Sequence, residues 1–229
     1  MLAKLKLLTT PKGIDSALML SAMLIIAVGN YSNLDLALAD SMFDGVRGQF
    51  PAGAGALTGS FQSGMTLLAA AAILLAIWDA VRPMRWCASR RSALRVVALS
   101  AVLVPLSIDL LASLSGASCP TDVLRYGGLE AYARLLETVP AHVSATQCLP
   151  ATQTSLAWWL LALPLFFWPR RPRLAALAAG TMLLCGLGFG WLQQLQGAQF
   201  LTHTLWSAWI ASFLIYLLYQ LLQADDALA

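Results

Sequence analysis

Six apolar runs, separated by polar segments, set the pattern of the chain. They cover residues 14–31, 62–81, 96–115, 153–168, 174–192 and 204–222. A helix of about 20 apolar residues crosses the hydrocarbon core of a bilayer, which is about 30 Å thick. The fourth and fifth runs are shorter, and tryptophans near their ends extend them into the headgroup region. The pattern therefore predicts a single all-α domain over residues 1–229, a bundle of six transmembrane helices.

The basic residues predict the orientation of this bundle. Eleven of the fourteen lysines and arginines lie before the first run, between the second and third, or between the fourth and fifth. Because cytoplasmic loops carry an excess of lysine and arginine, these segments and both termini are expected to be cytoplasmic. The loops 32–61, 116–152 and 193–203 are then outer loops. Within the second of them, helical spacing at 129–136 predicts a short helix along the membrane surface.

The start of the chain allows a second interpretation. Lys4 and Lys6 precede an apolar stretch, and "ALAD" at 37–40 follows it, as in a secretory signal peptide with its cleavage site. We expect this segment to be retained as the first span.

Composition supports the membrane interpretation. Hydrophobic residues make up 59% of the chain and charged residues 11%, with a mean hydropathy of +0.72. A soluble domain carries about 25% charged residues. The net charge of +3 gives no indication of nucleic acid as a partner.

Four cysteines are present, and two of them fall in the second outer loop. Cys119 and Cys148 are expected to form a disulfide, because the outer side of a cytoplasmic membrane is oxidising. Metal ligation by this pair is the weaker alternative, and no metal site is predicted.

Two of the acids and one pair of glycines within the predicted spans have a specific interpretation. Asp109 lies deep in the third span, where a carboxyl group is costly, so we expect it to be protonated or to face an outer cavity. Asp79 is near a helix end beside Arg82 and is expected to form a helix-end ion pair. Gly186 and Gly190 form a small-xxx-small pair that favours close helix packing.

Three segments resemble one known family. "CPTD" at 119–122 followed by "YGG" at 126–128, "MFDGVRGQFP" at 42–51 and "GAQFLTHTLWSAW" at 197–209 resemble the type-2 phosphatidic acid phosphatase superfamily. The bacterial branch of that family reads Cys-Pro-Trp-Asp followed by Tyr/Phe-Gly-Gly in its outer loop. The resemblance implies a six-span lipid phosphatase fold in a bacterial inner membrane, with the site facing the periplasm.

Active members of that family carry the motifs K-x6-R-P, P-S-G-H and S-R-x5-H-x3-D. The lysine and arginines hold the phosphate, the last histidine attacks phosphorus with help from the aspartate, and the middle histidine protonates the leaving alcohol. Alignment on Pro120, Pro150 and Gly197 gives the residues that occupy these positions here. In motif order they are Ala112, Cys119, Gln153, Gln193, Gln199 and His203. The resemblance thus implies a degenerate site.

The substitutions remove the chemistry. A glutamine amide has no nucleophilicity toward phosphorus, so Gln199 cannot form a phospho-enzyme. Gln153 cannot supply a proton, a role worth roughly 10²–10⁴ in rate. Each lost charge-assisted hydrogen bond to phosphate removes about 1.5–3 kcal/mol of binding. We therefore expect no catalytic residues and no cofactor.

A neutral, amide-lined outer pocket remains, and it suits a lipid headgroup or a sugar. Its predicted ligand-binding residues are Gln153, Gln193, Gln196, Gln199, His203 and Asp109. The glutamines are equally consistent with packing left over from an ancestral pocket.

Three functions follow, in order of preference. The first is a catalytically inactive phosphatase-like protein, a lipid-binding or accessory subunit. The second is an active lipid phosphatase with a rearranged site that uses His142 or His203. The third is a structural subunit of a larger membrane complex. The expected partners are a membrane lipid and, for an accessory or structural subunit, a partner membrane protein.

Overall fold

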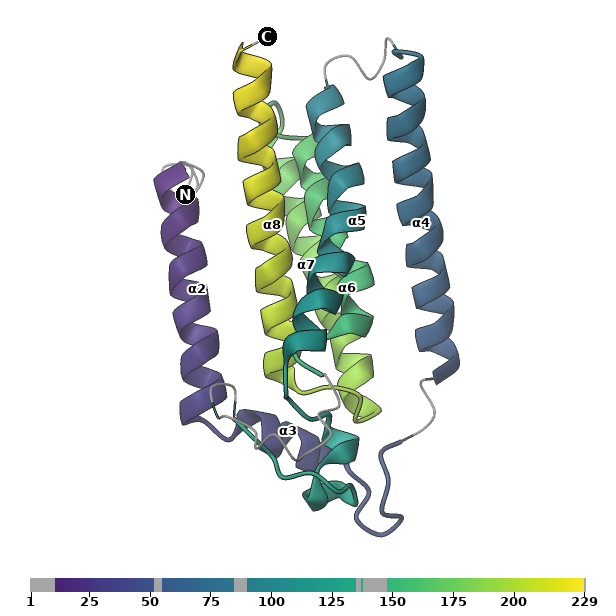
Figure 1. The fold of residues 1–229 in the computed structure, drawn as a ribbon, viewed down its shortest axis with the longest axis vertical. Helices are drawn as coiled ribbons and strands as arrows, with labels where there is room; N and C mark the ends of the chain where they lie inside the picture. Colours follow the sequence, from purple (N-terminus) through teal and green to yellow (C-terminus); the bar gives the residue numbers. More distant parts are fainter. Residues whose placement is uncertain (1–10, 52–54, 85–89, 135–136, 138–147, 229) are drawn as a thin grey trace.

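Long helices run side by side along the vertical axis of the molecule, and short elements close its lower end (Figure 1). The computed structural model describes residues 11–51, 55–84, 90–134, 137 and 148–228, and these form helices and irregular segments with two isolated β-bridges. In chain order the helices are α2 (Pro11–Tyr31), α3 (Leu34–Met42), α4 (Gly55–Val81), α5 (Arg91–Leu114), η3 (Pro120–Asp122), η4 (Leu124–Tyr126), α6 (Thr152–Trp158), η5 (Trp159–Phe166), α7 (Pro172–Leu195) and α8 (Leu201–Leu228).

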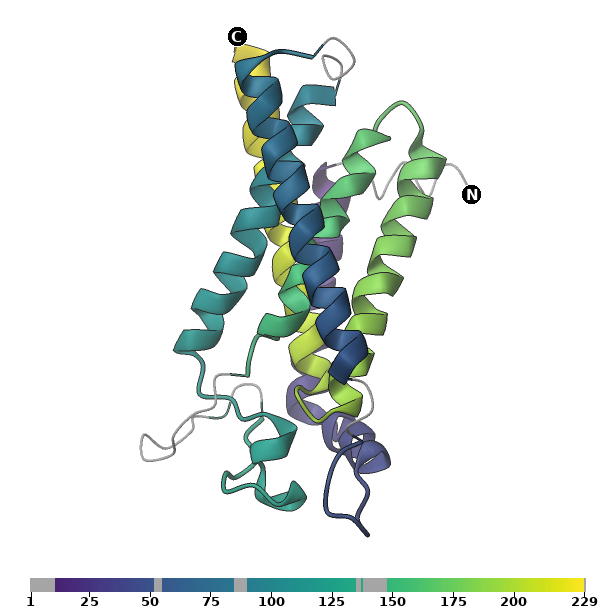
Figure 2. The ribbon, with the colours of Figure 1, turned by 90° about the vertical axis from the view of Figure 1, so that its right-hand side faces the viewer.

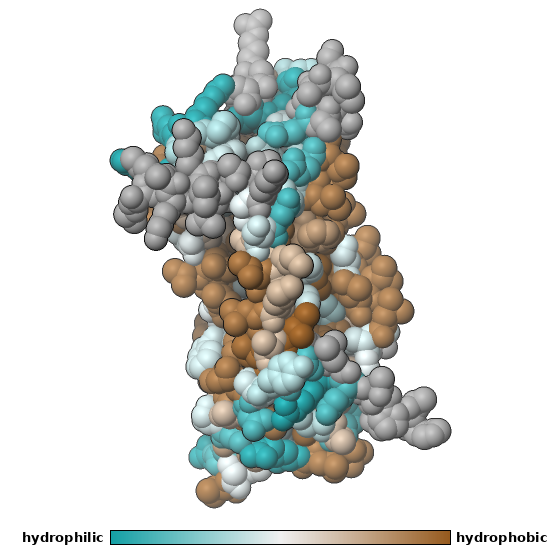
Figure 3. Space-filling model, turned by 90° about the vertical axis from the view of Figure 1, so that its left-hand side faces the viewer, coloured by the Kyte–Doolittle hydropathy of each residue, from teal (hydrophilic) through white to brown (hydrophobic). Residues whose placement is uncertain are grey.

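Five of these helices are long and apolar enough to cross a membrane: α2, α4, α5, α7 and α8. Each of these helices covers one of the predicted apolar runs, and α5 ends one residue before its run does. On the face shown in Figure 3, a hydrophobic belt lies between two hydrophilic ends. The chain is therefore a multi-pass membrane protein with an all-helical fold.

The fourth predicted run, 153–168, forms shorter helices than the other five. It contains α6 with seven residues and the 3-10 helix η5 with eight, and these follow each other directly. Trp158, Ala157 and Ala162 have no exposed surface. The segment packs against α4, α5, α7 and α8, so it is the core around which the long helices gather.

Two glycines of α7 make this packing close. A Cβ on Gly186 would collide with the indole ring of Trp158, and one on Gly190 would collide with the Thr204 side chain. The small-residue pair is therefore a helix-packing feature, as the sequence indicates.

The first long helix, α2, stands at the side of the bundle and packs on α8 (Figures 1 and 2). The indole Nε1 of Trp209 donates a hydrogen bond to the carbonyl oxygen of Leu18 at 2.8 Å. At the lower end the chain turns into α3, and the guanidinium of Arg134 donates to Asn30 O and, at 3.0 Å, to Asn33 Oδ1. The segment after η4 therefore holds the turn between α2 and α3.

The predicted surface helix at 129–136 is wrong over its described part, residues 129–134, which are irregular. The backbone N–H of Glu130 donates to Asp122 O, and Glu130 O accepts from the N–H of Leu124, both at 2.7 Å. These bonds pair the segment with the η3–η4 turns and use the backbone groups that a helix would need. The short α-helix at this end of the bundle is α3, between α2 and α4.

The partner of Asp79 also differs from the expected one. Its carboxylate accepts from Nε of Arg91 at 2.7 Å and from the backbone N–H of Met84 at 2.8 Å. Arg82 instead lies over the ring of Trp78, 5.5 Å from the centroid. The ion pair thus links α4 to α5 and does more than cap α4.

Substitution of Gly186 tests the packing of α7. Gly186→Ala is expected to destabilise the protein by about 1–3 kcal/mol, because the added methyl group meets the buried indole of Trp158. Gly188→Ala is the matched control, since a Cβ there meets open space and alanine favours helix. Thermal unfolding in detergent measures both variants. Equal midpoints for the two would contradict this account of the packing.

Candidate functional site

A polar cap closes the lower end of the bundle, and we define it as residues 34–50, 115–134, 148–151 and 193–203. It contains α3, the η3–η4 turns, the start of the segment that leads into α6, and the turn between α7 and α8. Most of the sequence-predicted site residues lie in this cap or in the helix turns that enter it.

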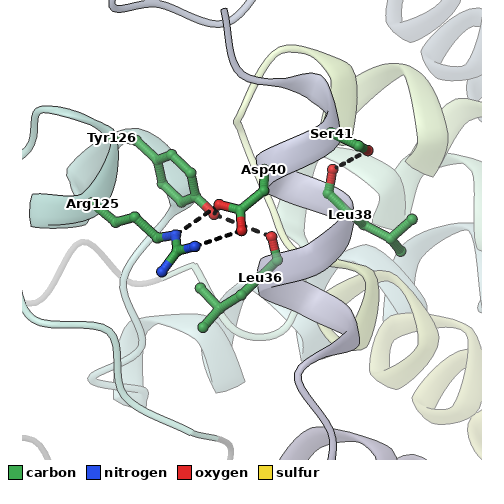
Figure 4. Close-up of polar contacts among 6 residues, drawn as sticks. All are labelled: Leu36, Leu38, Asp40, Ser41, Arg125 and Tyr126. Atoms are coloured by element: carbon green, nitrogen blue, oxygen red, sulfur yellow. Dashed lines mark hydrogen bonds and ion pairs between the residues drawn. The ribbon is translucent and has the colours of Figure 1, made fainter. Parts of the chain in front are cut away.

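A three-residue polar contact joins α3 to the η3–η4 turns (Figure 4). The guanidinium of Arg125 donates to both carboxylate oxygens of Asp40, at 2.7 and 2.6 Å. The hydroxyl of Tyr126 donates to the same carboxylate at 3.0 Å. The bond from Arg125 lowers the pKa of Asp40, and burial raises the pKa of Tyr126. This contact holds α3 across the end of the bundle.

The α7–α8 turn is fixed beneath this contact by Gly197. Its φ of +69° lies in the left-handed region, and a Cβ would collide with the ring of Phe50. The carbonyl oxygen of Gly197 accepts from the N–H of Thr121 at 3.2 Å. The turn is therefore clamped between the first and second loops of the cap.

Three glutamines beside this turn are buried, namely Gln193, Gln194 and Gln199. Among the described residues, neither amide atom of Gln193 has a hydrogen-bond partner, and the same holds for Oε1 of Gln194 and Nε2 of Gln199. A buried amide without a partner costs about 1–3 kcal/mol. The cap thus holds hydrogen-bonding capacity that the described part of the protein does not use.

His203 lies one turn into α8 and is also buried. Its ring packs edge-on against Phe200, with centroids 5.4 Å apart, and hydrogen-bonds the backbone of Cys148. Nδ1 has no partner within the described residues. An imidazole fixed in this way connects the α7–α8 turn to the segment that leads into α6.

The same region brings the beginnings of α6 and α8 together. The N–H of Ala151 donates to Oγ of Ser207 at 2.8 Å. The predicted disulfide between Cys119 and Cys148 is confirmed, with Cα atoms 5.3 Å apart. The N–H of Cys148 also donates to Ala117 O at 2.9 Å. Four segments far apart in sequence therefore converge at the cap.

An acid from α3 completes this polar cluster. Asp35 is buried and accepts from the backbone N–H of Thr202 at 3.0 Å and from its hydroxyl. Burial raises the pKa of Asp35, and its bonds to Thr202 oppose that shift. Burial, followed by the charge of Asp35, raises the pKa of Tyr132 to about 12. A cavity of about 10 Å³ adjoins Asp35, Gln194 and Gln199, and this is roughly the space that one water needs.

The structure does not gather all the predicted site residues. Gln193, Gln199 and His203 are all buried on either side of the α7–α8 turn, whereas Gln153 is exposed on the first turn of α6 and Asp109 is exposed on α5.

Two further predicted positions have structural contacts. Gln196 points to the other side of the turn, where its amide donates to Oγ1 of Thr58 on α4 at 2.7 Å. Ala112 is buried at the end of α5. Of the predicted ligand-binding residues, Gln199 adjoins the small cavity described in the cap.

Sequence reasoning missed Gln194 and Asp35. Gln194 directly follows Gln193 in α7, and both are buried because this end of the helix is enclosed by the cap. Asp35 belongs to an acidic loop segment, and 167 residues separate it from Thr202. Its pairing has no local sequence signal.

The buried glutamines of the cap can donate and accept hydrogen bonds but carry no charge. Within the described ranges, no group of three or more His, Cys, Asp or Glu side chains is placed to hold a metal. His142 lies outside the described residues, so its distance from His203 is not part of this geometry. The cluster offers amides, hydroxyls, one imidazole and one buried carboxyl group.

Comparison with protein-family models, curated proteins and solved structures finds no match for this chain. The resemblance to the phosphatases therefore remains a prediction from the sequence motifs.

Asp35 makes the stability of the cap depend on pH. Since its folded-state pKa is raised, protonation favours the folded state, and this contribution is lost as pH rises from about 4 through the raised pKa. The thermal unfolding midpoint of the wild type is therefore expected to fall relative to that of Asp35→Asn as pH rises. Thermal unfolding from pH 4 to 8 measures this difference.

Thr202→Val provides the opposing variant. It removes a hydroxyl donor that stabilises the Asp35 carboxylate, so it is expected to make the fall in stability with pH steeper than in the wild type. The role assigned to Asp35 would be contradicted if the unfolding midpoints of wild type and Asp35→Asn differed by the same amount at every pH from 4 to 8.

Proposed function

We propose that this protein is a catalytically inactive, lipid-phosphatase-like membrane protein that binds a lipid headgroup at the polar cap and acts as an accessory subunit. One observation carries the proposal: Gln193 and Gln199 are buried with unused amide atoms at positions where the family motifs place phosphate-binding and nucleophilic side chains. Amide donors and acceptors suit hydroxyl, sugar or ester oxygens and do not require a dianion.

The chemistry of the cluster supports inactivity. Nucleophilic attack on phosphorus needs an activated side chain, and the amide of Gln199 offers none. Gln153, at the position of the acid that protonates the leaving group, is exposed, whereas Gln193 and Gln199 are buried. His203 is the remaining base, but its ring is packed against Phe200 and bonded to the backbone of Cys148. Both contacts favour a structural role for this imidazole.

The distribution of charge supports the expected orientation. Seven described arginines lie at the end opposite the cap, where the described helices carry the acids Asp15, Asp79, Asp225 and Asp226. The arginines are Arg82, Arg90, Arg91, Arg95, Arg170, Arg171 and Arg173. The three arginines in the cap all have local partners, including Asp44 for Arg47. We propose that the arginine-rich end is cytoplasmic, which places the cap in the bacterial periplasm and the chain in the inner membrane.

The dimensions of α6 and η5 support a sixth crossing. Seven α-helical residues at about 1.5 Å each and eight 3-10 residues at about 2.0 Å each extend about 26 Å. The hydrocarbon core is about 30 Å thick. The narrower 3-10 helix thus lets a short segment traverse most of the bilayer, and we propose six spans with both termini cytoplasmic.

The absence of turnover is the first prediction of this proposal. Purified protein in nanodiscs is expected to release no more phosphate from phosphatidic acid or a polyprenyl pyrophosphate than a boiled sample does. His203→Ala is expected to leave that background unchanged. Phosphate release well above the boiled control that His203→Ala abolishes would instead establish a lipid phosphatase with a rearranged site.

The second prediction concerns the buried amide of Gln193. Without added lipid, Gln193→Leu is expected to raise the free energy of unfolding by about 1–3 kcal/mol, because it removes an unpaired buried polar group. A neutral glycolipid, monoglucosyl diacylglycerol, is expected to stabilise the wild type and to lose this effect on the variant.

Thermal unfolding with and without the glycolipid separates binding from packing. Gln49→Leu is the matched control, because Gln49 is an exposed amide in the same cap. The binding role would be overturned if the glycolipid stabilised the wild type and Gln193→Leu equally, or if it stabilised neither. The buried amides would then be packing residues without a ligand.

A further inference from the structure

A second polar hollow lies at the end of the bundle opposite the cap, between α4 and α5. Its volume is about 130 Å³, and its walls include Ala76 and Ala80 of α4 and Arg91 and Arg95 of α5. The alanines lie one helical turn apart on the same face of α4. Their small side chains leave the space that larger residues would fill.

The charges around this hollow are arranged for an anion. Asp79 is buried in the wall and accepts from Nε of Arg91 at 2.7 Å, which fixes the orientation of that guanidinium. Arg95 lies one turn further along α5 and is exposed. It forms no ion pair with a described residue. Two arginines therefore face one carboxylate, and the hollow keeps a net positive charge.

The surface of α5 continues from this hollow as an apolar stripe. Leu99, Val102, Leu106 and Leu110 follow Arg95 at intervals of three or four residues, so they share its helix face. All four are exposed. A lipid whose phosphate lies at Arg95 therefore has an apolar surface below it for an acyl chain.

Trp78 marks the depth of the hollow in the bilayer. It is exposed one residue before Asp79, and the guanidinium of Arg82 lies over its ring. Tryptophan and arginine at a helix end are typical of the boundary between hydrocarbon and headgroups. The hollow is thus level with lipid phosphates.

We propose that this hollow is a binding site for the phosphate of an anionic glycerophospholipid, whose acyl chain lies along the exposed stripe of α5. Arginine suits this ligand because its planar guanidinium donates several hydrogen bonds to phosphate oxygens. The apolar stripe over Leu99, Val102 and Leu106 favours a lipid over a free anion, and the exposed Asp109 lies beyond it, about one turn further from Arg95. The site is separate from the cap and independent of the function proposed there.

Phosphatidylglycerol in phosphatidylcholine nanodiscs tests the site. Native mass spectrometry across a series of phosphatidylglycerol fractions gives the relative affinity of the two lipids for the protein. Arg95→Gln is expected to weaken phosphatidylglycerol binding about fivefold to tenfold, because it removes one cation near the membrane surface. Arg95→Lys is expected to keep part of the binding, since it retains the charge without the planar guanidinium.

Arg173→Gln is the matched control, an exposed arginine on α7 at the same end of the bundle. It is expected to bind phosphatidylglycerol like the wild type. Equal losses in Arg95→Gln and Arg173→Gln would mean diffuse attraction to the basic surface and overturn the proposal. Wild-type protein without preference for phosphatidylglycerol would also overturn it, as would displacement of the lipid by inorganic phosphate at equal concentration.

Discussion

The burial of α6 and η5 among α4, α5, α7 and α8 is the constraint on which the rest of the structure depends. Trp158 occupies the centre, and α7 reaches it only because Gly186 carries no side chain. The residues before α6 are then drawn to the start of α8, where Ala151 bonds Ser207 and Cys148 adjoins His203. The position of the cap is a consequence of how the core is packed.

The cap differs in kind from the helical bundle that it closes. Membrane spans satisfy their backbone groups internally and pack through apolar and small side chains. The cap instead relies on hydrogen bonds between distant segments, such as Asp40 with Arg125 and Asp35 with Thr202. In such a network the amide of Gln193 and Nε2 of Gln199, which have no partner among the described residues, stand out, because their burial costs free energy that a ligand with hydroxyl or carbonyl groups would offset.

The sequence predicted best what depends on local pattern. Apolar runs identified α2, α4, α5, α7 and α8, and the cysteines of the second outer loop identified the disulfide. Helical spacing at 129–136 failed, because the bonds of Glu130 to the η3–η4 turns override local preference.

The candidate site was predicted less completely than the helices. Counting from motifs placed Gln193 and Gln199 at the α7–α8 turn but could not tell that Gln153 points outward. The acid on α3 and the pairing of Asp79 with Arg91 depend on tertiary contacts that leave no periodic signal. The spacing of residues along the sequence does not show which face of a helix the cap residues will bury.

The contacts of α2 have a consequence for assembly. Its bonds run to α8, from Trp209 to Leu18, and its continuation α3 is joined to Thr202. Because translation proceeds from the N-terminus, α2 leaves the ribosome well before α8 exists, and it must wait in the bilayer for its docking surface. Closure of the cap therefore waits for the synthesis of α8, and a nascent chain that stops before α8 leaves α2 without its bond to Trp209 and Asp35 without the bonds that Thr202 provides.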